Sequence, residues 1–244
     1  MKACAIIQAR TGSTRLPGKV LMDLAGKPVL QRVIERVSQF RRVDDMIVAT
    51  SVAPSDDAIE SLCDTLNLGV YRGDEFDVLG RFCQAARQAD ADLCVRITAD
   101  CPLIDPGISD HIIHQFLESD PPVDYASNKI PQSYPRGLDT EVFTREALEK
   151  AARNASHAYE RTHVTAHMYQ HPESFRLLSV VSDTERASWR WTLDTKDDLA
   201  FVRAVYAKLA ETCFSWLDVI ELLRQSPRIR ALNSHVRQKD VWEG

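Results

Sequence analysis

Residues 3–19 read Ala-Cys-Ala-Ile-Ile-Gln-Ala-Arg-Thr-Gly-Ser-Thr-Arg-Leu-Pro-Gly-Lys, an apolar run followed at once by a cationic loop. The uninterrupted apolar run from Ala3 to Ile7 is typical of a strand that is covered on both faces. The loop carries Arg10, Arg15 and Lys19 and no acidic residue. Backbone N–H groups of a glycine-containing loop can turn toward an anion, and cationic side chains neutralise its charge. This stretch therefore predicts a polyphosphate site at the end of the first strand.

The loop differs from two common phosphate-binding motifs. The dinucleotide fingerprint G-x-G-x-x-G is absent. A Walker A loop has four residues between its glycines and Ser or Thr after its Lys, whereas five residues separate Gly12 from Gly18, and Val20 follows Lys19. The alternative is a solvated basic turn, which three cations without an acid directly after a buried strand disfavour. We expect phosphate binding by a loop of another class.

The pattern of the first 120 residues predicts the fold class. Short apolar runs alternate with stretches of helical periodicity. We expect strands at 3–7, 46–49, near 70 and at 93–97, and helices at 28–40, 55–66, 78–89 and 108–117. Such alternation indicates β-α-β units and an open α/β sheet, mostly parallel and flanked by helices. Ligands of such sheets bind at the carboxyl ends of the strands.

The second half is less regular. Its pattern predicts strands at 125–127, 141–143, 177–181 and 189–193, and helices at 145–154 and 159–169. Thr195 and Ser215 can each cap a helix, with an aspartate three residues on. No Gly/Ser-rich linker or repeat divides the chain, so we expect one domain over residues 1–244.

Composition excludes several classes of protein. Thirty Lys and Arg against 35 Asp and Glu give a net charge of −5, whereas proteins that bind nucleic acid carry a basic excess. No apolar run approaches the ~20 residues of a membrane span, and the first one is too short for a signal peptide. The six cysteines lack metal-site spacing, so we expect buried thiols. These features predict a cytoplasmic protein without membrane insertion or a nucleic-acid partner.

Two acids follow predicted strands and could hold a metal. Asp100 comes after the strand at 93–97, and Asp194 ends the one at 189–193. Mg²⁺ takes carboxylate oxygens and keeps substrate phosphates as further ligands. The alternative is that these acids cap the following helices, although Thr195 is the better cap beside Asp194. Spacing alone leaves both interpretations open. Asp105, before a proline, is expected to begin a helix.

Other polar residues have weaker signals. The stretch 133–143 combines Arg136, Asp139 and Glu141 in a loop with Pro and Gly, which suits a polar substrate, a hairpin loop or a subunit contact. His163 and His167 have the i, i+4 spacing of a zinc pair, but the Glu that a metalloprotease has after the first His is missing. A helix-surface or subunit-facing role is favoured for these histidines.

The motifs, taken in order, resemble a known family. They span residues 6–21, 96–105, 124–128, 134–143 and 190–199. Together they are similar to the cytidylyltransferase family of spore-coat polysaccharide biosynthesis proteins, relatives of the acylneuraminate and 3-deoxy-manno-octulosonate cytidylyltransferases. Two departures are Thr98, where the octulosonate enzymes have Gln, and Thr162, where the family pattern Glu-Arg-Glu-His-Val-Thr has an acid.

The resemblance implies a nucleotide-diphospho-sugar transferase fold, Rossmann-like with a small insertion in the second half. It implies transfer of CMP from CTP to an acidic sugar with release of pyrophosphate, dependence on Mg²⁺, and a homodimer. It divides the domain into a nucleotide-binding half (1–120), an acceptor-binding and dimerisation region (121–185), and a part with the second metal ligand and C-terminal helices (186–244).

The same resemblance suggests site residues. We expect nucleotide contacts from Ala9, Arg10, Gly12, Ser13, Arg15, Lys19 and Arg96. Catalytic roles are expected for Lys19, Arg15 and Asp100, and metal binding for Asp100 and Asp194. Acceptor contacts are expected from Arg136, Asp139, Glu141 and His163.

Three other functions compete with this interpretation. One is a glycosyltransferase of the same fold that uses a nucleotide sugar, although its usual Asp-x-Asp motif is missing after the central strands. Another is a non-catalytic nucleotide-binding protein, which the presence of Lys19, Asp100 and Asp194 disfavours. The third is a cytidylyltransferase for a phosphonate or another small acid, which the sequence does not separate from the sugar enzyme.

Overall fold

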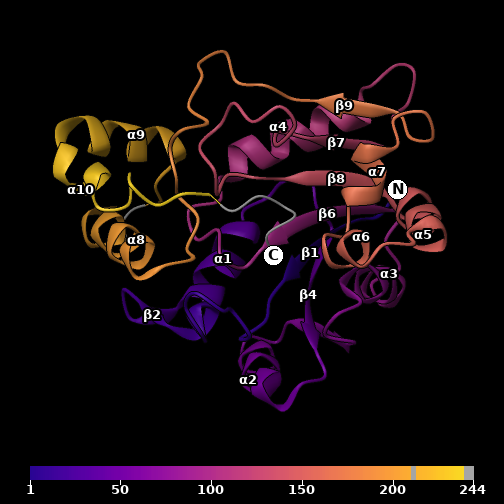
Figure 1. The fold of residues 1–244 in the computed structure, drawn as a ribbon, viewed down its shortest axis with the longest axis horizontal. Helices are drawn as coiled ribbons and strands as arrows, with labels where there is room; N and C mark the ends of the chain where they lie inside the picture. Colours follow the sequence, from indigo (N-terminus) through magenta and orange to yellow (C-terminus); the bar gives the residue numbers. More distant parts are fainter. Residues whose placement is uncertain (210–212, 239–244) are drawn as a thin grey trace.

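The computed structural model describes residues 1–209 and 213–238 (Figure 1). Its strands are β1 (Ala3–Gln8), β2 (Asp23–Leu24), β3 (Lys27–Pro28), β4 (Asp45–Ser51), β5 (Gly69–Gly73), β6 (Leu93–Thr98), β7 (Tyr125–Ser127), β8 (Glu141–Thr144) and β9 (Leu177–Ser179). Its helices are η1 (Lys19–Leu21), α1 (Val29–Val37), η2 (Pro54–Asp56), α2 (Asp57–Thr65), α3 (Val78–Gln88), α4 (Pro106–Leu117), α5 (Arg145–Asn154), α6 (Ala158–Thr162), α7 (Ala166–Gln170), α8 (Lys196–Leu209), α9 (Trp216–Gln225) and α10 (Pro227–Ala231). The part expected over 186–244 thus includes residues 210–212 and 239–244, which lie outside the described residues.

Seven strands form the main sheet in the order β5-β4-β1-β6-β8-β7-β9. All neighbouring pairs are parallel except those of β8, which runs antiparallel to β6 and β7. The expected mostly parallel α/β sheet is therefore confirmed. In the register of β1 and β6, Gln8 lies beside Thr98. The loop after β1 and the acid after β6 consequently leave the sheet at the same edge.

Alternate residues of β1 belong to two cores, one on each face of the sheet. Ala5 and Ile7 pack with α1, α2, α4, α8 and α9. Cys4 and Ile6 pack with α3, α5 and α7. Figure 1 shows α8, α9 and α10 gathered at one side and α3, α5 and α6 at the other. Because both faces are covered, β1 is the continuous apolar strand that its sequence predicts.

The predictions of two elements in the second half were wrong. The predicted helix 159–169 is two short helices, α6 and α7, because the backbone reverses between them at Val164, whose φ is +54° and whose side chain is fully buried. The predicted strand 189–193 forms only a single bridge, between Arg136 and Arg190. Its neighbour there is an irregular loop, so no ladder continues within residues 1–209 and 213–238.

The cysteines and helices also bear on the sequence predictions. All six thiols are free, and five are buried as expected. Cys213, expected to be buried, is exposed, with its sulfur 3.2 Å from the side-chain oxygen of Gln39. None of the described helices has the length and apolar character to span a bilayer.

Candidate active site

Lys19 joins the two predicted metal ligands. Its ammonium nitrogen lies 2.7 Å from a carboxylate oxygen of Asp100 and 2.7 Å from one of Asp194. Gly18, in the left-handed region at φ +70°, makes the turn that places Lys19 at the start of η1. Lys19 is only 7% exposed. Three residues predicted from separate motifs therefore meet at one point beside the carboxyl ends of β1 and β6.

Two arginines complete this cluster. Arg15 lies 2.9 Å and Arg190 2.7 Å from the second carboxylate oxygen of Asp194. Arg190 also makes two bonds of 2.9 Å to Asp198. Arg15 was predicted here, whereas Arg190 was missed. Its sequence signal is the spacing of four and eight residues from the two aspartates, within a stretch rich in aromatic residues that is expected to be buried.

Asp198 is fully buried and fixes the backbone around Asp194. Its carboxylate accepts hydrogen bonds of 3.0 Å from the backbone N–H groups of Asp194 and Thr195, and one of 2.9 Å from the side-chain amide of Asn233. The backbone N–H of Asp198 donates to the Thr195 hydroxyl, which confirms the expected cap. Burial raises the pKa of Asp198, but the bonds from Arg190 and Asn233 outweigh it and hold that pKa below its usual value. The position of Asp194 is thus set before any ligand arrives.

Asp100 and Lys19 are both charged at neutral pH. Burial raises the pKa of Asp100, yet the charge and hydrogen bond of Lys19, with further bonds from Thr98 and Cys101, lower it to about 2. Burial lowers the pKa of Lys19, but the charges of Asp100 and Asp194 raise it above its usual value. Two carboxylates that share one cation are hard oxygen donors of the kind Mg²⁺ prefers. The donor set therefore fits a magnesium ion, with an ammonium group beside it for phosphate.

The loop after β1 is held in a defined shape. The backbone N–H of Thr11 donates to Asp56 at 2.8 Å, and its hydroxyl donates to the same oxygen at 2.6 Å. The N–H groups of Ser13 and Gly18 both donate to the Thr11 carbonyl. Ala9 is buried and Gly12 is exposed. A guanidinium nitrogen of Arg10 lies 3.9 Å from a carboxylate oxygen of Glu75, in the segment between β5 and α3. The predicted nucleotide-binding residues of this loop therefore surround one fixed turn.

A buried arginine near this loop was missed by the sequence reasoning. Arg81 on α3 is 2% exposed, and one terminal nitrogen donates to the Asp74 carbonyl at 2.8 Å. Its Nε and its other terminal nitrogen have no hydrogen-bond partner among the described residues. Burial, followed by the charge of Arg10, lowers its pKa. A cation on the apolar face of the predicted helix 78–89 was the available signal.

The predicted residues Arg96 and Glu141 lie together. They form a buried ion pair across β6 and β8, and Arg96 also donates to the Gln8 side chain at 3.0 Å. Glu141 accepts from Tyr125 at 2.7 Å and from Thr165 at 2.6 Å. Burial raises the pKa of Glu141, but the charges of Lys129 and Arg96, together with these bonds, lower it to about 2. This pair joins strand β6 of the first 120 residues to strand β8 of the second half.

The remaining predicted acceptor residues occupy the loop beside this pair. Asp139 accepts from the Gln132 side chain at 2.9 Å, and burial raises the pKa of Asp139. Arg136 is half-buried and has no ion-pair partner among residues 1–209 and 213–238. His163 is half-buried in the turn between α6 and α7. The loop therefore offers one cation without an ion-pair partner among the described residues and, three positions on, a carboxyl group whose pKa is raised.

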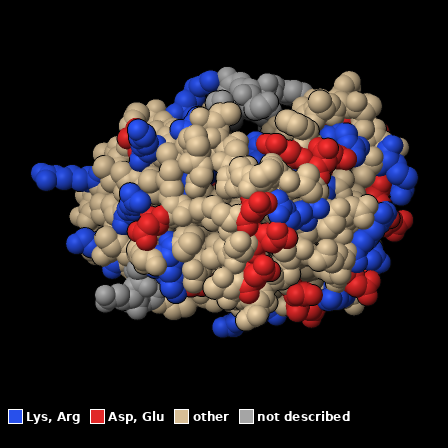
Figure 2. Space-filling view, turned by 90° about the horizontal axis from the view of Figure 1, so that it is seen from below, with Lys and Arg blue, Asp and Glu red and all other residues tan. Residues whose placement is uncertain are grey.

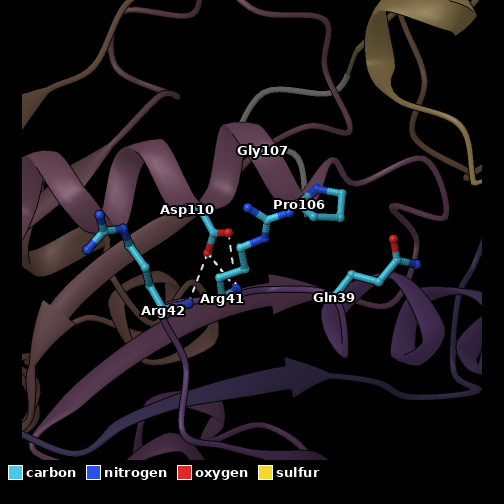
Figure 3. Close-up of a pocket in the computed structure, with 6 residues that line it drawn as sticks. All are labelled: Gln39, Arg41, Arg42, Pro106, Gly107 and Asp110. Carbon is cyan, nitrogen blue, oxygen red and sulfur yellow. Dashed lines mark hydrogen bonds between the residues drawn. The ribbon is translucent and has the colours of Figure 1, made fainter.

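A hollow of about 790 Å³ elsewhere on the surface lacks this convergence of charge. It is lined by Gln39, Arg41, Arg42, Pro106, Gly107 and Asp110 (Figure 3). The Asp110 carboxylate already accepts from the backbone N–H groups of Arg41 and Arg42. These hydrogen bonds link the segment after α1 to helix α4 and partly satisfy the carboxylate. The chemistry therefore points to the Lys19 cluster, not to this hollow.

The surface charge agrees with a local anion site. Figure 2 shows acidic and basic side chains interspersed on the face viewed from below. A mixed face attracts an anion only weakly at long range. An anionic ligand would therefore be drawn by nearby groups, such as Arg10, Arg15 and Lys19.

Comparison with known proteins identifies the family. Residues 4–225 match the family described as Cytidylyltransferase. The chain belongs to the cytidylyltransferase family. As a cytidylyltransferase it is a CTP-dependent nucleotidyltransferase, which confirms the class of enzyme that its motifs suggested.

Relatives of this cytidylyltransferase cover nearly its whole length. It is 38% identical to an uncharacterized protein of Methanocaldococcus jannaschii, over all of this chain and 99% of the relative. It is 33% identical to a spore coat polysaccharide biosynthesis protein of Bacillus subtilis, over 91% of this chain and 94% of the relative. The solved structure of a cytidylyltransferase from Leptospira borgpetersenii superposes with a TM-score of 0.90 at 31% identity, covering 94% and 96% of the two chains. The nucleotide-diphospho-sugar transferase fold is thereby confirmed.

Proposed function

We propose that this cytidylyltransferase transfers CMP from CTP to an acidic sugar of the nonulosonic or 3-deoxy-ulosonic type, releasing pyrophosphate for surface polysaccharide or glycan synthesis. The observation that carries the proposal is Lys19, held between Asp100 and Asp194 at 2.7 Å from each. This arrangement supplies an ammonium group for phosphate and two carboxylates for a cation in one place. Function in the cytoplasm and as a homodimer is part of the proposal and rests on the motif resemblance.

The reaction would be an in-line displacement at the α-phosphorus of CTP. A sugar hydroxyl oxygen loses its proton to solvent and forms the new bond to the α-phosphorus, the bond from that phosphorus to the bridging oxygen breaks, and pyrophosphate leaves. Such transfers depend mainly on positioning and on stabilising negative charge. Lys19 and Arg15, both on the loop after β1, would move from the carboxylates to the phosphates and stabilise the charge of pyrophosphate. Asp100, whose pKa is about 2, is a weak proton acceptor, so we assign it a binding role.

Asp100 and Asp194 would hold Mg²⁺. A bound Mg²⁺ would neutralise charge on the α-phosphate and acidify the attacking hydroxyl. Asp194 is held in position without a bound ion, because its backbone N–H donates to Asp198 and Asp198 is in turn paired with Arg190. Lys19, which pairs with both carboxylates in this structure, would then serve as a phosphate ligand.

The acceptor would lie against the loop that contains Arg136 and Asp139. Arg136 can pair with the sugar carboxylate, because no other described residue neutralises its charge. Asp139, with its raised pKa, can exchange hydrogen bonds with sugar hydroxyls. The backbone of Arg136 is joined to the 189–191 segment by bonds of 2.9 and 2.7 Å. The acceptor loop and the segment leading to Asp194 are therefore mechanically coupled.

Arg81 would provide a further contact for the nucleotide. Its two unpartnered nitrogens are buried, its third nitrogen donates to the Asp74 carbonyl, and the neighbouring Glu75 lies 3.9 Å from Arg10 of the loop after β1. Buried donors without partners are costly unless a ligand satisfies them. We assign these donors to the bound nucleotide.

Thermal unfolding with CTP, UTP, ATP and GTP, each with and without Mg²⁺, tests the nucleotide half of the proposal. A ligand at 100 times its dissociation constant adds about 2.7 kcal/mol of stability. We expect a shift selective for CTP and enhanced by Mg²⁺. Pyrophosphate release with CTP and a panel of acidic sugars then tests the acceptor, with phosphonates as the competing class. A shift with a nucleotide sugar and none with any triphosphate would favour the glycosyltransferase.

A further inference from the structure

We propose that Glu160, His167 and His171 form a second metal site, for Zn²⁺ or a similar transition metal, where α6 meets α7. One ligand atom from each of these residues lies within 4.8 Å of the others. None of them takes part in the Lys19 cluster. The site is therefore distinct in place and in ligand chemistry from the proposed magnesium site, and it does not depend on the proposed function.

The local fold creates this cluster. The spacing of four residues places His167, on α7, and His171, directly after it, on the same face, with ring centroids 4.3 Å apart. The reversal of the backbone at Val164 turns α7 back on α6 and brings Glu160 beside both rings. The zinc pair considered from sequence, His163 and His167, is thus replaced by His167 and His171.

Glu160 divides its two carboxylate oxygens between two tasks. Oε2 accepts 2.9 Å bonds from the backbone N–H groups of Ser156 and His157, and so caps α6. Oε1 lies 2.6 Å from Nδ1 of His167 and 3.8 Å from Nε2 of His171. A buried carboxylate oriented by two backbone donors is a rigid ligand, and its other oxygen points at the imidazoles.

His171 is oriented as a metal ligand is. Its Nδ1 lies 2.9 Å from Glu173 Oε1, which fixes the ring and leaves Nε2 facing Glu160. Metal-binding histidines typically donate their other ring N–H to a carboxylate in this way. The His171 side chain is 40% exposed, so an ion can reach the site from solvent.

The donor set selects the class of metal. Two imidazoles and one carboxylate, with one open position, match the ligands of Zn²⁺ in tetrahedral sites, whereas Mg²⁺ prefers oxygen ligands only. With metal–ligand bonds of about 2.0 Å, neighbouring ligand atoms are about 3.3 Å apart. The 3.8 Å between Oε1 of Glu160 and Nε2 of His171 is close to this value. The 2.6 Å between the same oxygen and Nδ1 of His167 must increase slightly when an ion binds. A bound ion would replace the proton that joins Glu160 to His167.

The site would stabilise the turn at Val164. Thr165, the next residue, donates to Glu141 at 2.6 Å. Joining α6 to α7 by a metal would therefore hold the turn that reaches the Arg96–Glu141 pair. We expect an effect on thermal stability and not a direct part in phosphate chemistry.

Titration of the chelator-treated full chain with Zn²⁺, followed by calorimetry and thermal unfolding, tests this proposal. Titration with Co²⁺ gives a second readout, since its visible absorption reports a tetrahedral nitrogen-containing site. Excess Mg²⁺ and an Asp194→Asn background exclude binding at the Lys19 cluster. His171→Ala is the test variant because His171 is partly exposed, and His235→Ala is the control, since His235 is an exposed histidine that also pairs with a carboxylate, Asp197.

We expect one Zn²⁺ to bind to the wild type and to His235→Ala in the presence of Mg²⁺, and a loss of at least tenfold in affinity in His171→Ala. Glu173→Gln should weaken binding less than His171→Ala does, because Glu173 acts through the ring. Absence of Zn²⁺ binding to the wild type, or equal binding by His171→Ala with an unaltered Co²⁺ spectrum, would overturn the proposal. A helix junction joined only by hydrogen bonds would then remain.

Discussion

Lys19 and Asp100, 81 positions apart in the chain, lie with ammonium nitrogen and carboxylate oxygen 2.7 Å apart. If this ammonium group serves the leaving pyrophosphate, Lys19→Met should lower kcat by about 10²–10³-fold, the usual effect of removing one preorganised donor. Pyrophosphate release at saturating CTP measures the change. Lys27→Met, which removes an exposed lysine paired with Glu35, should leave the rate close to that of the wild type. Equal rates in both variants would contradict the assignment.

Asp100→Asn should impair the use of Mg²⁺ while the fold is retained, because the amide keeps the shape of the carboxyl group. We expect kcat to fall by about 10²-fold or more, and the Mg²⁺ concentration for half-maximal rate to rise, since a metal contributes several kcal/mol at such a site. The exposed Asp64 on α2 supplies the control variant Asp64→Asn. Unchanged Mg²⁺ dependence in Asp100→Asn would remove Asp100 from the proposed metal site.

The Arg96–Glu141 pair should make stability sensitive to acid. The pKa of Glu141 is lowered from 4.5 to about 2 on folding, so its contribution is complete above about pH 4.5 and is lost as the pH falls toward 2. Glu141→Gln, which leaves Arg96 buried without its counter-ion, should be about 3–5 kcal/mol less stable at pH 7. The difference should shrink at pH 3. Urea unfolding at both pH values measures this, and a constant difference would contradict it.

Gly137 allows the acceptor loop to approach the segment that leads to Asp194. It has φ +103°, and a Cβ there would lie 2.7 Å from the Trp191 carbonyl carbon. Gly137→Ala should cost roughly 2–4 kcal/mol from strain and overpacking, and it should weaken binding of CTP with Mg²⁺. Gly18→Ala, at φ +70° and with no other described residue close to the added Cβ, should cost only about 1–2 kcal/mol. Thermal unfolding of both variants compares them, and equal losses would argue against the clash.

Substitution of Arg81 distinguishes a structural role of this buried cation from a role in binding CTP. Arg81→Met removes two unpartnered donors, each of which costs about 1–3 kcal/mol when buried, so stability should change little or rise. Affinity for CTP should fall at least tenfold. Arg87→Met, at an exposed position of the same helix, should alter neither property. A large loss of stability with unchanged CTP affinity would assign Arg81 to the fold alone.

Much of the fold could be predicted because the first half is locally consistent. The apolar run 3–7 and the helix cap Asp105 agree with their surroundings in the folded chain. The convergence of Asp100 with Lys19 followed from the parallel sheet, since both residues follow strands that end at the same edge. Local pattern and topology therefore sufficed for the centre of the candidate site.

The errors arose where tertiary contacts overrule the local pattern. The periodicity of residues 159–169 does not reveal that Val164 adopts a left-handed conformation in the core. The alternation of residues 189–193 does not show that only an irregular loop lies beside them. The sequence also does not show that Arg96, expected at the nucleotide, and Glu141, expected at the acceptor, form an ion pair between β6 and β8. The unsatisfied nitrogens of Arg81 are likewise visible only in three dimensions.

Asn233 lies beyond residue 225, where the match to the family ends. Its amide nevertheless donates to the Arg190 carbonyl and to Asp198, at 2.9 Å in each case. A chain shortened to the family boundary would lose this tether, although every residue proposed to touch substrate would remain. Residues beyond 225 thus help to hold Arg190 and Asp198 in place beside Asp194, and we expect variation there to alter turnover without any contact with substrate.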